Sequence, residues 1–202
     1  MLITLEEIDG AGKSSLARGL ADALAEREPV VLREPGGVEL SERLRALVKD
    51  PALTVGGRAE ALIYAAARAQ LVEERLRPLL EAGRLVLLDR FVDSSLAYQG
   101  AGRGLGIDAI RALNAFGTAG VVPDRTLLLR IEPAAGLARV GVRGEAQDRI
   151  ESEREAFWLT CARAYDELAA AEPARWAVID AAQSADRVLA DALAQLAPLL
   201  EP

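Results

Sequence analysis

The residues that most restrict the fold of this chain are 7–15, Glu-Ile-Asp-Gly-Ala-Gly-Lys-Ser-Ser. They follow the apolar residues 1–6, which predict a buried strand, and they lead into a helical pattern that runs from residue 13 to about residue 27. In a strand, glycine-rich loop and helix of this kind, backbone N–H groups and the helix N-terminus surround a phosphate. The segment therefore predicts a phosphate-binding loop in which Lys13 reaches the transferred phosphate and Ser14 ligates Mg²⁺.

The alternative for this segment is an ordinary glycine-rich turn before a helix. Lys13 argues against that alternative, because Lys13 and Lys49 are the only two lysines and arginine supplies the other positive charges. The loop departs from the usual pattern at Glu7, where glycine is expected. A side chain reduces backbone freedom there and brings a carboxylate to the rim of an anion site. We expect Glu7 to point away from the nucleotide, toward an arginine, and the loop to work.

Apolar runs and helical periodicity alternate along the rest of the chain. Further strands are expected at residues 29–33, 85–88, 126–131 and 176–179, and helices near 40–47, 57–82, 107–119, 133–141, 151–172 and 184–199. This alternation predicts an α/β fold, a P-loop NTPase-type three-layer doubly wound parallel sheet of about five strands flanked by helices, with a small lid. Ligands are expected at the carboxyl ends of the strands. We expect residues 1–202 to form one domain, with a mobile loop at residues 141–147.

Composition excludes several classes of function. A net charge of -7 and a pI near 4.9 argue against a nucleic-acid surface, because such surfaces carry excess positive charge. The absence of histidine excludes histidine-based catalysis and histidine-ligated zinc, and the single cysteine, Cys161, permits no internal disulfide. The apolar runs are too short to span a membrane and no signal segment is visible, so we expect a soluble cytoplasmic protein that binds neither membrane nor nucleic acid.

Short segments rich in polar residues follow several predicted strands and helices. In chain order they are Leu5 to Lys13, Arg33 to Gly37, Glu60 with Tyr64 to Arg68, Asp89 to Gln99, Pro123-Asp124, Asp148 to Glu151 and Ile179 to Gln183. Apart from Glu7, they resemble the thymidylate kinase family over nearly the whole chain. The resemblance implies a nucleoside monophosphate kinase that transfers the γ-phosphoryl group of ATP to dTMP, in dTTP biosynthesis, with Mg²⁺ as cofactor. It also implies a homodimer packed through helices, for which the alanine-rich residues 59–69 would allow close approach.

The resemblance implies a dTMP site as well. Tyr64 is expected to stack on thymine, and Arg68, one helical turn later, to reach the carbonyl edge of the base. Arg90 is expected to clamp the monophosphate, and Tyr98 to crowd the 2′ position of a ribonucleotide. The other residues expected to contact the acceptor are Asp9, Pro35, Arg45, Ser95 and Gln99. A core tyrosine at position 64 and surface arginines at positions 45 and 68 are the alternatives.

The remaining expected residues serve ATP and the transferred group. Those expected to contact ATP are Asp9, Gly10, Ala11, Gly12, Lys13, Ser14, Ser15, Arg139, Ala182 and Gln183. Asp89 is expected to bind Mg²⁺ through water, together with Ser14. A lid at about residues 139–151 is expected to deliver a guanidinium, with Arg149 as the best candidate and Arg143 as the second, for which a solvated helix face is the alternative. The expected catalytic residues are Lys13, Asp9, Arg90, Arg149 and Arg143.

Three alternatives to this function stay open. A phosphate monoester has a second pKa near 6, so it is already anionic and needs no general base, whereas a deoxynucleoside kinase on the same fold needs a carboxylate base. A different nucleoside monophosphate kinase is the related alternative. A regulatory nucleotide-binding switch would carry an Asn-Lys-x-Asp sequence, which this chain lacks. The third alternative is a catalytically impaired relative, because of Glu7.

Overall fold

Because the strands of the sheet are parallel, the carboxyl ends of its central strands lie side by side. The computed structural model describes residues 1–142 and 148–200, and within them five parallel strands pair in the order β2-β3-β1-β4-β5. The strands are β1 (Leu2–Glu6), β2 (Val30–Arg33), β3 (Val86–Asp89), β4 (Arg125–Arg130) and β5 (Trp176–Asp180). Leu5 of β1 lies opposite Asp89 of β3 in the register. The loop after β1 and the turn after β3 therefore emerge side by side.

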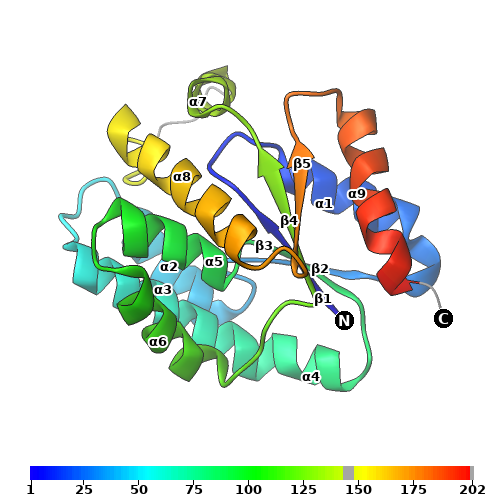
Figure 1. The fold of residues 1–202 in the computed structure, drawn as a ribbon. Helices are drawn as coiled ribbons and strands as arrows, with labels where there is room; N and C mark the ends of the chain where they lie inside the picture. Colours follow the sequence, from blue (N-terminus) through cyan, green and yellow to red (C-terminus); the bar gives the residue numbers. More distant parts are fainter. Residues whose placement is uncertain (143–147, 201–202) are drawn as a thin grey trace.

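Helices cover both faces of the sheet, as the alternating pattern predicts. They are α1 (Lys13–Ala23), α2 (Glu39–Lys49), α3 (Gly57–Leu71), α4 (Arg77–Glu81), α5 (Val92–Ser95), α6 (Ile107–Thr118), α7 (Pro133–Val142), α8 (Glu155–Ala171) and α9 (Ala185–Leu200). One 3₁₀ turn, η1 (Ala25–Arg27), and two π-helical segments, η2 (Val72–Leu76) and η3 (Leu96–Gly102), complete the described elements. Helices α1 and α9 lie on one face, and α3, α5, α6 and α8 on the other (Figure 1). The three-layer α/β prediction is confirmed.

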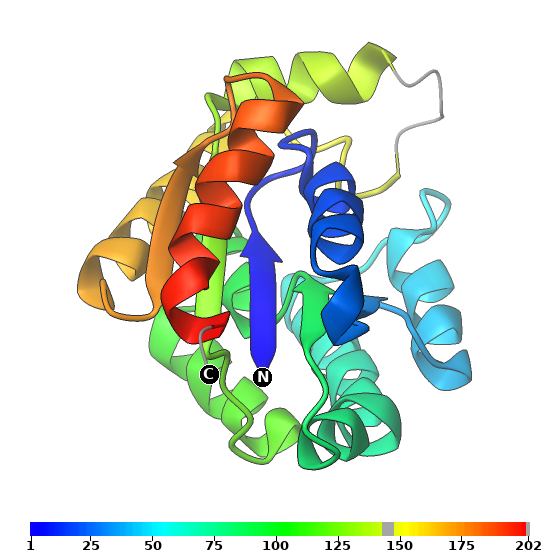
Figure 2. The same cartoon turned by 90° about the vertical axis from the view of Figure 1, so that its right-hand side faces the viewer.

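The central strands are buried on both faces, which explains their continuous apolar sequences. Leu127, Leu128 and Leu129 of β4 are fully buried, so both faces of this strand meet covering helices. The edge strands β2 and β5 each expose one valine, Val31 and Val178. The chain termini, Met1 and the described end of α9, lie at the edge of the sheet opposite the loop after β1 (Figure 2). No helix in the described part of the chain is long and apolar enough to cross a membrane.

The structure differs from the sequence prediction mainly at the ends of helices. The expected helix 57–82 runs through α3, η2 and α4, and the π-helical turn precedes Pro78, whose nitrogen cannot donate. The expected helix 151–172 begins only at residue 155, because the Oδ1 atom of Asp148 accepts the N–H groups of Ile150 and Glu151 and closes a turn. Periodicity did not predict the helical residues 92–102. Of the expected lid, residues 143–147 lie outside the described residues.

Candidate functional site

The loop between β1 and α1 encloses the side chain of Lys13. Its Nζ atom donates hydrogen bonds to the carbonyl oxygens of Glu7 (2.9 Å) and Ile8 (2.9 Å). Burial and the neighbouring Arg90 guanidinium lower the pKa of Lys13 to about 8, against the opposite effect of nearby carboxylates such as Asp89. The ammonium group therefore sits at the base of the loop, held by carbonyl groups that a bound phosphate can replace.

Two glycines give this loop its shape. Gly12 precedes α1 in the left-handed region, with φ 98°, and Gly10 has φ 85°. A Cβ atom on Gly10 would lie 2.0 Å from the carbonyl oxygen of Gly136 in α7, so no residue with a side chain fits there without movement. The loop thus passes directly beneath α7, the helix that leads to the expected lid.

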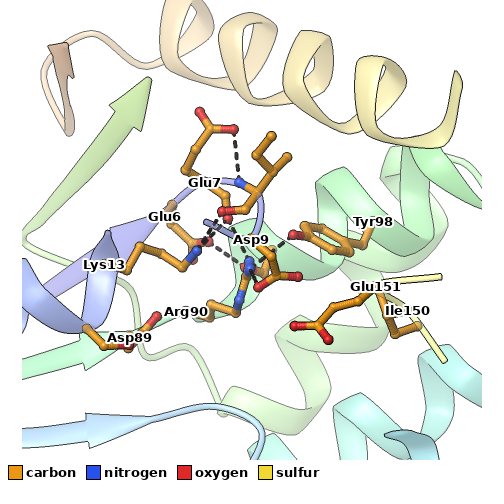
Figure 3. Close-up of polar contacts among 12 residues, drawn as sticks. Glu6, Glu7, Asp9, Lys13, Asp89, Arg90, Tyr98, Ile150 and Glu151 are labelled. Carbon is orange, nitrogen blue, oxygen red and sulfur yellow. Dashed lines mark hydrogen bonds and ion pairs between the residues drawn. The ribbon is translucent and has the colours of Figure 1, made fainter. Parts of the chain in front are cut away.

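Arg90 follows β3 and points toward the same loop. Its Nη2 atom donates to Asp9 Oδ1 (2.8 Å) and to the Tyr98 hydroxyl (3.0 Å), and its Nη1 atom donates to the Glu7 carbonyl (2.8 Å) (Figure 3). Burial alone would raise the pKa of Asp9, but the charges of Arg90 and Lys13 outweigh it and hold this pKa at about 2. Lys13 and Arg90 donate to one and the same oxygen atom, that of Glu7.

One cavity of about 260 Å³ contains most of the predicted site residues. The predicted residues that line it are Asp9, Gly10, Gly12, Lys13, Ser14, Ser15, Pro35, Arg45, Tyr64, Arg68, Asp89, Arg90, Ser95, Tyr98 and Gln99. They come from the loops after β1 and β2, from the start of α1, from the end of β3 and the turn after it, from α2 and α3, and from the helical residues 92–102. Side chains from residues 9 to 99 therefore meet at the carboxyl ends of the strands.

Ser14 and Asp89 lie together beside the loop. The Ser14 hydroxyl donates to Asp89 Oδ2 (2.8 Å), which places one hydroxyl and one carboxylate at the start of α1. Mg²⁺ in phosphate-transfer sites is bound by one or two protein ligands together with substrate phosphates and waters. In the described part of the chain no group of three His, Cys, Asp or Glu residues forms a protein-only metal site. The two side chains fit a magnesium ion that is bound together with a nucleotide.

Arg68 lies at the cavity wall with its guanidinium bound by protein groups. It is buried, and its nitrogen atoms donate to Glu34 Oε2 (2.7 Å), Ser95 Oγ (3.0 Å), the Phe91 carbonyl (2.8 Å) and Asn114 Oδ1. Burial raises the pKa of Glu34 to about 7, although Arg68 lowers it. The predicted contact of Arg68 with a base stays a prediction, because in this structure its donors are used by the protein.

The structure places Arg149 outside the cavity. Its Nε atom donates to the Val48 carbonyl at the end of α2 (2.9 Å), and its Nη2 atom donates to the buried Glu60 (2.6 Å). Arg149 thus connects α2 with α3 and does not face the phosphate loop. Arg143, the other predicted lid arginine, lies outside the described residues. The predicted contact of either arginine with a transferred phosphoryl group remains untested.

The predicted ATP-binding residues of the C-terminal half meet at the end of β5. Both terminal nitrogens of Arg139 donate to the Ala181 carbonyl (3.2 Å each), and the Ala182 N–H donates to Asp180 Oδ1 (2.9 Å). Gln183 donates to the Asp180 carbonyl (3.3 Å). These residues lie beside one another but do not line the cavity, and neither does Ala11, which is buried within the loop.

Several cavity residues were not predicted as site residues. They are Arg33, Glu34, Lys49, Ser94, Asp148, Ile150 and Glu151. The Glu151 carboxylate is turned toward Arg90 and Asp9 (Figure 3). Lys49 forms an ion pair with Asp148 (2.5 Å). Lys49 stood out as one of two lysines, and Glu151 ends a segment that resembles the family, so the sequence carried a signal for both.

Glu7 turns away from the phosphate side of the loop, as predicted (Figure 3). Its φ of 152° lies in the region that favours glycine, and its carboxylate is fully buried. Oε1 accepts the Ile8 N–H (2.9 Å), and Oε2 has no hydrogen-bond partner among the described residues. Burial raises the pKa of Glu7 to about 7. The described residues contain no ion pair between Glu7 and an arginine, so that part of the prediction is not borne out there.

Comparisons with known proteins agree over most of the chain. A family model described as "Thymidylate kinase" matches residues 5–192. A protein named "Thymidylate kinase" from Lactobacillus delbrueckii subsp. bulgaricus is 47% identical over 193 residues, which cover 93% of this chain and 91% of that one. Another of the same name, from Deinococcus radiodurans, is 47% identical and covers 95% and 93%. The crystal structure of thymidylate kinase from Ehrlichia chaffeensis superimposes with a TM-score of 0.81 at 28% identity, covering 98% of both chains.

Proposed function

Because the chain belongs to the thymidylate kinase family, we propose that it transfers the γ-phosphoryl group of ATP to dTMP, giving dTDP and ADP in dTTP biosynthesis. On this proposal residues 1–202 act as one nucleoside monophosphate kinase domain in the cytoplasm. The observation that carries the proposal is the meeting of Lys13 and Arg90 on the carbonyl oxygen of Glu7. A cation from the ATP side and a cation from the acceptor side are thereby close enough to bind one phosphoryl group between them.

On the acceptor side, the cavity supports a nucleotide with a small base and a deoxyribose. Tyr64 would stack on thymine, with Ser95 and Gln99 at the same wall. Tyr98 is held by Arg90, whose guanidinium lies 5.0 Å from the centre of the tyrosine ring. A tyrosine fixed in this way would crowd the 2′ position and disfavour a ribonucleotide. Arg45, Pro35 and Asp9 complete the acceptor site.

Catalysis in this site consists of positioning and charge neutralisation. The dTMP phosphate is largely ionised near neutral pH, so the acceptor needs no general base. Lys13 and Arg90 would bind the transferring phosphoryl oxygens, on which negative charge is spread in the transition state. Ser14 and Asp89 would hold Mg²⁺, which would supply positive charge to neutralise the ATP phosphates. Asp9 would keep Arg90 in place between the two substrates.

On the ATP side, the phosphates would lie on the backbone of residues 10–15 and the adenine at the end of β5. Arg139 is bound to the Ala181 carbonyl and Gln183 lies two residues later, so α7 and the β5 loop would hold the base between them. Arg143 would supply the lid guanidinium. The contacts of Arg149 with Val48 and Glu60 support a structural link between the lid and α2 instead.

We further propose a homodimer packed through α3 and α6. These helices lie against each other, and the Cβ position of Gly117 would be 3.3 Å from the Ala65 carbonyl. Their outer faces expose two large apolar side chains, Phe116 (89% exposed) and Leu62 (57% exposed). Large apolar groups exposed on neighbouring helices are typical of protein interfaces.

A coupled ADP-release assay with a panel of acceptors tests the assignment. dTMP is expected to be the best acceptor, dUMP poorer, and AMP, GMP and CMP nearly inert. Thymidine distinguishes a monophosphate kinase from a deoxynucleoside kinase, because only the latter phosphorylates it. Faster turnover of thymidine, AMP or CMP than of dTMP would overturn the proposed function.

A further inference from the structure

A buried cluster of three polar side chains lies directly behind Arg90. Glu6, the last residue of β1, is fully buried, and its Oε2 atom accepts hydrogen bonds from the hydroxyls of Ser94 (2.5 Å) and Tyr165 (3.0 Å). Ser94 belongs to α5 and Tyr165 to α8, so the cluster joins three elements that are far apart in the sequence. Both hydroxyl oxygens also accept from Arg90 Nη1, at 3.0 Å from Ser94 and 3.5 Å from Tyr165.

The direction of these hydrogen bonds depends on the charge of Glu6. An ionised carboxylate only accepts, so the Ser94 and Tyr165 protons turn toward Glu6 and their lone pairs face the Arg90 guanidinium. Burial and the neighbouring Asp93 raise the pKa of Glu6 to about 7, while the Ser94 hydroxyl and the Arg90 charge oppose the rise. The two hydroxyl oxygens also lie 2.9 Å apart, where either can donate to the other. The ionised carboxylate draws hydroxyl protons of this cluster toward Glu6 and so leaves hydroxyl lone pairs for the Arg90 guanidinium.

Glu6 also holds the backbone that carries Arg90. Arg90 has φ 71°, a left-handed conformation that a residue with a side chain adopts only when its surroundings impose it. Two hydrogen bonds flank this position: the Arg90 N–H donates to the Leu5 carbonyl (3.0 Å), and the Phe91 N–H donates to Glu6 Oε1 (2.7 Å). The same carboxylate thus fixes both the main chain and the side chain of Arg90.

We propose that Glu6, Ser94 and Tyr165 act as positioning residues that set the place and orientation of the Arg90 guanidinium at the acceptor phosphate. The proposal rests on the proposed function, since it assigns these residues to dTMP binding by Arg90. Tyr165 contributes only its hydroxyl to this role. Its ring packs separately in the core, edge-on against Tyr98 and Trp176.

The test removes single hydroxyl groups and measures steady-state kinetics for each substrate. In Tyr165→Phe and Ser94→Ala the ring or backbone stays in place but one acceptor for Arg90 is lost. Each variant is expected to raise the KM for dTMP about 10-fold, the effect of one hydrogen bond to a charged group. The KM for ATP is expected to stay within about twofold, because Lys13 and the loop backbone bind ATP.

A matched control and a charge test separate positioning from packing. In Ser41→Ala a buried hydroxyl is also lost, but that hydroxyl donates to the Ala67 carbonyl and forms no hydrogen bond with Arg90, so both KM values are expected to remain unchanged. Glu6→Gln keeps the shape of Glu6 but presents an NH₂ group to Ser94 and Tyr165, which turns their protons toward Arg90. This variant is expected to raise the KM for dTMP at least as much as Ser94→Ala does.

Two outcomes would overturn the inference while leaving the function intact. One is a wild-type enzyme active on dTMP whose Tyr165→Phe and Ser94→Ala variants keep its KM for dTMP. The other is an equal rise in both KM values in these variants with none in Ser41→Ala, which would indicate general distortion of the site. A wild-type enzyme that fails to use dTMP would instead contradict the proposed function itself.

Discussion

We expect Glu7 to make this protein less stable than a glycine at the same position would, by a difference that grows with pH. Three terms contribute. A side chain at φ 152° costs roughly 1–3 kcal/mol. Burial raises the pKa of Glu7 from 4.5 to about 7, and at about 1.4 kcal/mol per unit the ionised form costs roughly 3 kcal/mol above pH 7. A glycine at this position buries two fewer methylenes and has more conformational entropy in the unfolded chain. Together these two effects lower the stability of the glycine variant by about 2–2.5 kcal/mol.

The sign of the pH dependence follows from the raised pKa. The folded protein holds the Glu7 proton more tightly than the unfolded chain does, so the favourable contribution of protonated Glu7 is complete below about pH 4.5. That contribution is lost as the pH rises to about 7. Glu7→Gly is therefore expected to stabilise the protein by roughly 2–3 kcal/mol at pH 8 and by less than about 1 kcal/mol at pH 5.

Urea unfolding followed by circular dichroism at the two pH values measures this difference. Glu7→Ala is the matched control, because it removes the carboxylate but keeps a side chain at the strained φ. Glu7→Ala should lose the pH-dependent part of the destabilisation but retain the backbone strain. It should therefore be less stable than Glu7→Gly at both pH values. The affinity for ATP-magnesium is expected to change less than about tenfold in Glu7→Gly, because the Glu7 side chain points away from the nucleotide. A Glu7→Gly protein no more stable than wild type at pH 8, or a gain equal at both pH values, would refute the reasoning.

Other predictions follow from the contacts of the cavity. Lys13→Ala should lower kcat about 100- to 1000-fold while dTMP binding, measured by calorimetry, persists. Arg90→Ala should weaken dTMP binding heavily. Arg149→Ala should also act mainly on the KM for dTMP, because Arg149 binds Glu60 and α2 rather than the loop. A selective fall in kcat for Arg149→Ala would instead indicate a contact with the transferred phosphoryl group. Phe116→Asp should convert a dimer into a monomer in light scattering, and a wild-type monomer would contradict the proposed interface.

The phosphate loop and the order of the elements were predictable because their causes are local. The apolar run of β1 and the Gly-Lys-Ser spacing that follows it define a strand, a loop and a helix within the first quarter of the chain. Each strand of the sheet was placed within a residue or two, because strands buried on both faces must be continuously apolar. The residues of the acceptor site followed from family resemblance, and all of them line the cavity.

What the sequence did not reveal depends on contacts between distant residues. Nothing around Tyr165 indicates that its hydroxyl reaches Glu6, 159 positions away. The helical residues 92–102 were missed because their glycines break the helical pattern. The structure explains Gly102, where a Cβ atom would lie 2.6 Å from the Phe157 ring. Arg149 was expected at the phosphate because its segment resembles the family; in this structure its Nε atom donates to the Val48 carbonyl at the end of α2, and the phosphate contact stays a prediction.

The site is expected to transfer the γ-phosphoryl group of ATP to one preferred acceptor, dTMP. An equimolar mixture of dTMP, dUMP, dCMP, AMP and thymidine, incubated with the protein, Mg²⁺ and limiting ATP, tests it in a single reaction. Chromatography of the products is expected to show dTDP as the first and dominant product formed from the acceptors, in equal amount with ADP, while thymidine is left unchanged. Formation of dTMP from thymidine, or consumption of AMP or dCMP before dTMP, would contradict the account.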